Sequence, residues 1–154
     1  MRELITKLEE TGNLNQTEWI ALINGRTPKL AEFLFERARA VRHQYYGHDV
    51  YIRGLIEFTN YCRNDCYYCG IRCSNASVAR YRLTEDEILD CCQTGYRLGF
   101  RTFVLQGGED LYFTTERICS LVATIHAAFP DCAITLSIGE KTREDYQAYF
   151  DAGA

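Results

Sequence analysis

Residues 84–108 read TEDEILDCCQTGYRLGFRTFVLQGG, a stretch that carries a helix signal followed directly by a strand signal. Thr84 and Glu87 have the spacing of a capping box, which predicts a helix that begins after Thr84 and runs to residue 98. Gly99 is suited to end this helix, because glycine readily adopts the backbone conformation of a helix C-cap. The β-branched and apolar run at 102–106 predicts a strand that ends at two glycines.

The same alternation extends to both sides of this stretch. Strands are expected over 50–58 and 133–138, a helix is expected to stop at Pro130, and Thr142 is suited to cap a last helix. Because strands that alternate with helices form parallel sheets, we predict an α/β fold with the first three β-α units of a TIM-type barrel. Such a barrel takes about eight units, so we expect it to be incomplete and truncated. A small, complete three-stranded α/β protein is the alternative.

The first 47 residues have helical patterns only. Asn15 and Glu18 form a second candidate capping box, Pro28 suits the first turn of a longer helix, and Gly47 suits its end. We therefore expect two parts, an N-terminal helical segment over 1–47 and an incomplete barrel domain over 48–154.

Charge and hydrophobicity exclude two classes of partner. The net charge is -4 and no basic run occurs, so we expect no nucleic-acid surface, because binding there depends on Lys and Arg that neutralise phosphates. No apolar stretch approaches the roughly 20 residues that span a bilayer, and the N-terminal residues lack the apolar segment of a secretory signal. We expect no membrane partner and a cytoplasmic location.

Cysteine is the most informative residue type in the chain. Of its 8 cysteines, half lie in one segment, at Cys62, Cys66, Cys69 and Cys73. In a cytoplasmic protein such crowding indicates metal binding or catalysis more often than disulfide bonds. The first three have the spacing C-x3-C-x2-C, and thiolates suit iron–sulfur centres. We predict that these three bind a 4Fe–4S cluster with one iron left open for a ligand.

Two alternative kinds of metal site would use the same segment. A tetrahedral zinc ion, or a four-iron cluster with every iron ligated, would take Cys73 as its fourth ligand. Structural zinc sites more often have two cysteine pairs separated by a longer stretch, which disfavours zinc. An open iron requires Cys73 to remain outside the site.

Two further segments follow predicted strands, as the cysteines do. Gly107, Gly108 and Glu109 follow the second strand, and Glu140 follows the third. In β/α barrels the carboxyl ends of the strands lie on one face and carry the chemistry, so we expect these residues near the cysteines. Glycines there allow a ligand to approach the backbone. The alternatives are a tight loop for the glycines and a solvated acid at a helix start for Glu140.

These motifs together resemble the radical S-adenosylmethionine superfamily, in which a C-x3-C-x2-C loop precedes a Gly-Gly-Glu strand end. Residues 61–72, 81–84 and 136–140 resemble, within it, the HydE family of FeFe-hydrogenase maturation enzymes, which is similar to biotin synthase and methylornithine synthase. The resemblance covers essentially the whole chain and is weakest in the N-terminal helices. It lacks the later barrel strands and the C-terminal region of that family.

The resemblance implies cofactors, contacts and partners. The cofactors would be a 4Fe–4S cluster and S-adenosylmethionine, which the enzyme cleaves reductively to a 5′-deoxyadenosyl radical. Tyr68 would contact the adenine, Gly107, Gly108 and Glu109 the methionine amino group, and Glu140 the adenosyl side. No catalytic residue beyond the cluster ligands is implied.

The substrate would be an organometallic iron precursor or another small molecule, with a reductant such as ferredoxin or flavodoxin and with partner maturases. A biotin synthase-like or methylornithine synthase-like enzyme, or a catalytically incomplete iron–sulfur module, is the alternative.

Overall fold

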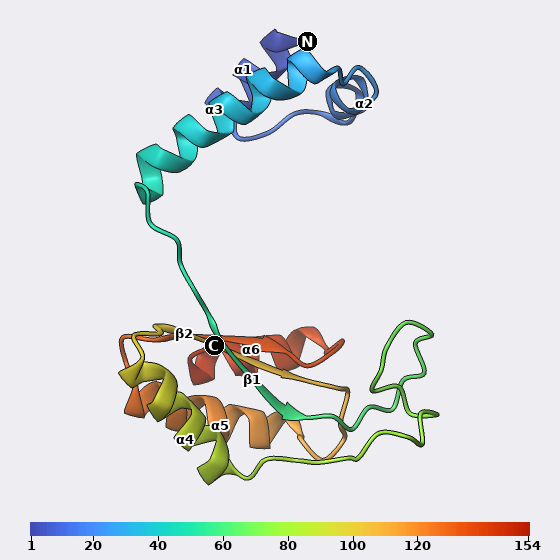
Figure 1. The fold of residues 1–154 in the computed structure, drawn as a ribbon, viewed down its shortest axis with the longest axis vertical. Helices are drawn as coiled ribbons and strands as arrows, with labels where there is room; N and C mark the ends of the chain where they lie inside the picture. Colours follow the sequence, from blue (N-terminus) through green and yellow to red (C-terminus); the bar gives the residue numbers. More distant parts are fainter. The chain divides into compact units, whose positions relative to one another are not determined.

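The computed structural model describes residues 1–154, which form two units, Met1–Tyr51 and Ile52–Ala154 (Figure 1). The first unit consists of α1 (Arg2–Thr11), α2 (Gln16–Asn24) and α3 (Pro28–Tyr46). The predicted capping box opens α2, since Asn15 and Glu18 each accept a hydrogen bond from the other's backbone N–H. A small core of Ile5, Leu14 and Leu22 holds this unit together. No helix of the chain combines the length and the apolar character that crossing a membrane requires.

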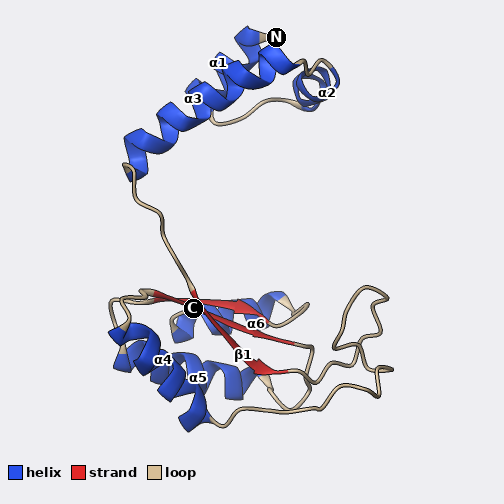
Figure 2. Cartoon of the chain, in the orientation of Figure 1, coloured by secondary structure: helices blue, strands red, loops and turns tan.

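The second unit alternates strands with helices (Figure 2). Its elements are β1 (Gly54–Thr59), α4 (Glu85–Arg97), β2 (Thr102–Gly107), α5 (Thr115–Ala128), β3 (Ala133–Ser137) and α6 (Arg143–Ala152). The strands are parallel in the order β1-β2-β3, which confirms the predicted α/β class. The predicted capping box of Thr84 and Glu87 opens α4, and Thr142 caps α6.

The first strand begins later than its sequence predicts. A strand was expected from residue 50, but β1 starts at Gly54, which pairs with Phe103 of β2. Val50, Tyr51 and Ile52 are 84%, 69% and 72% exposed. The β propensity of such residues is realised by packing on a sheet surface, and these three have no neighbouring strand to pack on.

The two faces of the sheet differ sharply. One face packs on the helices through buried residues of all three strands, among them Phe58, Leu105 and Ile134. Burying each such side chain contributes about 1.5–3 kcal/mol. The strand register places Glu57, Gln106 and Ser137 side by side, with their side chains on the opposite, exposed face. A polar row therefore lies on the uncovered face, toward the carboxyl ends of the strands.

Candidate functional site

The cysteine loop, defined as residues 60–81, connects the carboxyl end of β1 toward α4. It contains no helix and no strand, and its cysteines are free thiols. Cys62 and Cys69 are partly buried, whereas Cys66 and Cys73 are exposed. Loops longer than about 15 residues without secondary structure are uncommon and are usually either functional or disordered. The contacts described below hold this one against the strand ends.

The thiols suit an iron–sulfur cluster in kind, because they are free, soft ligands on a single loop. The structure does not bring them into a preformed cage: no three His, Cys, Asp or Glu side chains lie close enough together to hold a metal ion. Between Cys66 and Cys69, the rings of Tyr67 and Tyr68 are 96% and 93% exposed. Cluster binding would therefore require this tip of the loop to rearrange.

Glu109 joins the β2 loop to the cysteine loop. Its carboxylate accepts hydrogen bonds from Asn64 Nδ2 at 2.6 Å and from Arg63 Nε at 2.9 Å. Its backbone carbonyl also accepts from the backbone N–H of Arg63 at 3.1 Å. The ion pair itself is worth at most about 1 kcal/mol, because the Arg63 side chain is 57% exposed. Its effect is geometric: it fixes Glu109 beside the residue that follows Cys62.

Two glycines make this close approach possible. A Cβ atom on Gly108 would lie 2.1 Å from the carbonyl oxygen of Tyr61 and 2.7 Å from Cys62 Cβ. Gly139 has a φ of 82°, and a Cβ there would lie 2.1 Å from Glu109 Cγ. The loops that follow the three strands therefore meet one another. The space beside Gly108 that was expected to admit a ligand is taken up, on this side, by the cysteine loop.

Asp110 is the anchor beneath these loops, and its role was not foreseen from the sequence. The buried carboxylate accepts hydrogen bonds from Arg82 Nε at 2.6 Å, from a second Arg82 nitrogen at 2.9 Å and from Thr59 Oγ1 at 2.8 Å. Burial alone would raise the pKa of Asp110, but these hydrogen bonds outweigh it and lower the pKa. The Arg82 guanidinium also stacks 3.9 Å from the ring centroid of Tyr61, next to Cys62.

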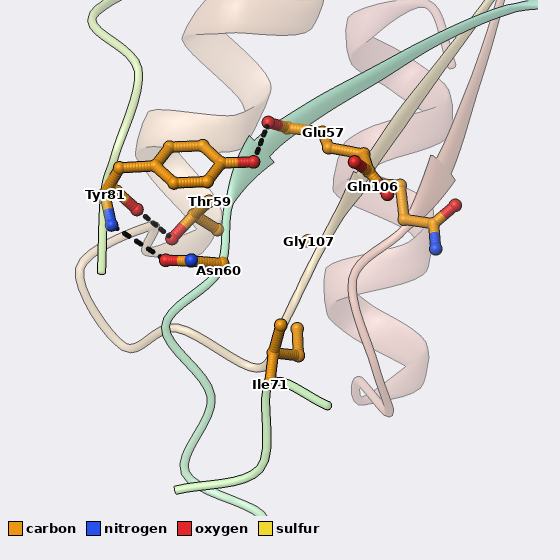
Figure 3. Close-up of a pocket in the computed structure, with 7 residues that line it drawn as sticks. All are labelled: Glu57, Thr59, Asn60, Ile71, Tyr81, Gln106 and Gly107. Atoms are coloured by element: carbon orange, nitrogen blue, oxygen red, sulfur yellow. Dashed lines mark hydrogen bonds between the residues drawn. The ribbon is translucent and has the colours of Figure 1, made fainter. Parts of the chain in front are cut away.

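A cavity of about 230 Å³ opens between the cysteine loop and the strand ends (Figure 3). Glu57, Gln106 and Gly107 line it from the sheet, and Ile71 from the cysteine loop. Tyr81 forms one wall, where its hydroxyl donates to the carbonyl of Glu57 at 2.9 Å. Thr59 and Asn60 complete the lining. Two residues of the exposed polar row, Glu57 and Gln106, thus line a cavity beside the cysteine loop.

Of the residues predicted to bind the cofactor, Gly107 lines this cavity, whereas Tyr68, Gly108, Glu109 and Glu140 do not. Glu140 is exposed after Gly139 and does not line the cavity. Among the cysteines outside the loop, Cys92 is fully buried, and desolvation raises its pKa to about 12. Burial also raises the pKa of Cys132. Both are therefore poor metal ligands and pack as small apolar side chains.

Several known proteins are similar to this chain in sequence and fold. The chain is 40% identical over 154 residues to the FeFe hydrogenase maturase subunit HydE of Thermotoga maritima, in a match that covers 99% of this chain and 43% of that protein. It is 34% identical over 110 residues to 3-methylornithine synthase of Methanosarcina acetivorans, covering 71% and 31%. The crystal structure of a methylornithine synthase matches with a TM-score of 0.76 and 31% identity, covering 98% of this chain and 45% of that one.

The chain spans less than half the length of these curated relatives. No protein-family model matches it.

Proposed function

Because the relatives that this chain matches belong to the radical S-adenosylmethionine superfamily, as its cysteine motif predicted, we propose that the chain carries the cofactor-binding part of such an enzyme. The observation that carries the proposal is the position of the motif. Cys62, Cys66 and Cys69 lie on the loop after β1, and this loop is bonded to the Gly-Gly-Glu loop after β2. Hydrogen bonds thus join two motifs that are far apart in the sequence, which supports the proposal that both serve one site.

In this proposal the three cysteines hold a 4Fe–4S cluster, and Cys73 remains outside the site. When bound, the reduced cluster supplies the electron that cleaves S-adenosylmethionine to a 5′-deoxyadenosyl radical. The protein binds and orients the cofactor: the Glu109 carboxylate receives the methionine ammonium, while Tyr68 and Glu140 contact the adenosyl part. Arg63 and Asn64 support this role, because they hold the Glu109 carboxylate at the cysteine loop.

The substrate would lie against the uncovered face of the sheet. Glu57, Gln106 and Ser137 form its polar row, and the cavity beside them opens toward the cysteine loop. We propose a role in the assembly of the FeFe-hydrogenase cofactor, with an organometallic iron substrate. The support is the 40% identity to a HydE maturase along nearly the whole chain. A ferredoxin or flavodoxin would supply the electron, and other maturases would be partners.

A second candidate is a methylornithine synthase-like carbon rearrangement. The similarity to 3-methylornithine synthase in both sequence and structure favours it over other chemistries. Both candidates share the cluster and S-adenosylmethionine and differ only in the substrate. An assay for 3-methylornithine formation and an assay for conversion of an iron–cysteine complex, each with the reconstituted protein, separate them.

The decisive experiment is anaerobic reconstitution of the chain with iron and sulfide. We expect a four-iron EPR signal that changes when S-adenosylmethionine is added, and formation of 5′-deoxyadenosine under reduction. Alanine at Cys62, Cys66 or Cys69 should abolish iron binding, whereas Cys73→Ala is the matched control and should retain it. Equal loss of iron in Cys73→Ala would contradict the open-iron site. A cluster whose signal ignores S-adenosylmethionine would leave an iron–sulfur module without this catalysis.

A further inference from the structure

We propose that Arg80 is a positioning residue that joins the two ends of the three-cysteine segment and holds its backbone in place before a cluster binds. This inference rests on the proposed function, because it concerns the same cysteine loop. One nitrogen of the Arg80 guanidinium, Nη1, donates to the carbonyl oxygen of Asn60 at 2.5 Å and to that of Ile71 at 2.7 Å. Asn60 lies two residues before Cys62, and Ile71 lies two residues after Cys69. A single side chain thus closes the segment that contains all three proposed ligands.

The other guanidinium nitrogen extends the closure past the third cysteine. Nη2 of Arg80 donates to the carbonyls of Arg72 at 2.7 Å and of Asn75 at 3.2 Å. All four acceptors are backbone carbonyls of the cysteine loop. Hydrogen bonds from a charged donor are about twice as strong as those between neutral groups. A planar guanidinium can reach four carbonyls at once, whereas a lysine ammonium presents a single compact charge with three donors.

Asn60 fixes the segment on either side of Arg80. Its side-chain amide donates to the carbonyl of Ala79 at 2.7 Å, and its side-chain oxygen accepts from the backbone N–H of Tyr81 at 2.7 Å. Its backbone N–H also donates to the carbonyl of Tyr81. The backbone that carries Arg80 is therefore tied to the end of β1, and the guanidinium acts from a fixed point.

Hydrophobic burial cannot replace these bonds. The core of the second unit takes no side chain from residues 60–82, and Tyr67 and Tyr68 at the tip of the loop are almost fully exposed. Fixing the backbone of each loop residue costs conformational entropy. Polar contacts, with those of Arg80 the most numerous, must therefore hold the loop. Because Arg80 bonds the ends of the segment and not its tip, cluster binding would have to rearrange only the tip.

The test compares Arg80→Lys, which keeps the charge but loses the planar fork, with wild type. The control is Arg101→Lys, since Arg101 also donates to two backbone carbonyls, those of Tyr96 and Phe100, away from the cysteine loop. Amide hydrogen exchange of the apo chain, residues 1–154, is measured for residues 62–75 and for β2 and β3. The rate of iron loss to a chelator is then measured after anaerobic reconstitution.

We expect exchange in residues 62–75 to become about tenfold faster in Arg80→Lys, with β2 and β3 unchanged and with faster iron loss. Arg101→Lys should match wild type within the loop. Unchanged loop exchange in Arg80→Lys would overturn the proposal, and so would an equal increase in the strands, because Arg80 would then stabilise the whole unit. The apo measurement is independent of the cluster. If wild type binds no iron, the proposed function fails while exchange still decides the role of Arg80.

Discussion

Replacing Gly108 by alanine should force the β2 loop and the cysteine loop apart. The added Cβ would lie 2.1 Å from the carbonyl oxygen of Tyr61, whereas real Cβ atoms essentially never approach closer than 3.0 Å. The loops must therefore separate by about 0.9 Å, and both obstacles, the Tyr61 carbonyl and Cys62 Cβ, belong to the cysteine loop. Overpacking costs about 1–3 kcal/mol, and an obstacle made of backbone places the cost near the upper limit.

Thermal unfolding and iron binding measure this effect. A loss of about 3 kcal/mol should lower the Tm by roughly 10 °C or more, and iron retention should fall because Cys62 is displaced. Gly70→Ala is the matched control: Gly70 directly follows Cys69, and a Cβ there meets nothing within 4 Å. The control should change stability by less than about 0.5 kcal/mol. If Gly108→Ala and Gly70→Ala have the same Tm and the same iron content, the steric argument is wrong.

Three further predictions concern the network, the helices and the thiols. The pKa of Asp110 is lowered in the folded protein, so the ionised carboxylate stabilises the fold above pH 3.8, its usual pKa, and this stabilisation is lost as the pH falls below that value. Urea unfolding from pH 7 to pH 3 should therefore show a steeper fall in the free energy of unfolding for wild type than for Asp110→Asn, and parallel curves would contradict this. Thr84→Ala removes the N-cap of α4 and should cost about 1 kcal/mol by urea unfolding, whereas Thr124→Ala, in the middle of α5, should cost clearly less. Iodoacetamide should modify exposed Cys66 quickly and Cys92 only on unfolding, because Cys92 is buried and its pKa is raised to about 12. Mass spectrometry of the native apo chain measures the modification, and equal modification of the two cysteines would show that Cys92 is not buried.

The sequence predicts the fold because the decisive signals are local. Thr84 with Glu87 and Asn15 with Glu18 lie three residues apart, and both pairs form the capping boxes that this spacing predicts. The start of β1 could not be predicted in the same way. Whether Val50 belongs to a strand depends on a partner strand, and the pairing with β2 begins only at Gly54. Pairing depends on the neighbouring strand, so the sequence of one strand does not predict where its pairing begins.

In the candidate site, too, the local features could be predicted from the sequence and the long-range contacts could not. The cysteine spacing is legible because the ligands are close together in the chain. The roles of Asp110 and Arg80 could not be predicted, because their hydrogen-bond partners are distant residues or backbone carbonyls, and every residue has a backbone carbonyl. The two arginines that flank Tyr81 are the one local signal. They indicate that this segment carries charge, but the acceptors are defined only by the folded loop.

The contacts of Gly108 and Glu109 change how variants of the Gly-Gly-Glu loop should be interpreted. The family resemblance assigns these residues to the methionine amino group of S-adenosylmethionine. On that basis alone, a bulky residue at Gly108 would weaken cofactor binding and leave the cluster intact. In the structure Gly108 lies against Cys62, and Glu109 is bonded to Arg63 and Asn64. A displacement of either loop must therefore move the other. Loss of cofactor binding in such a variant is evidence for a direct contact only if its iron content remains that of wild type.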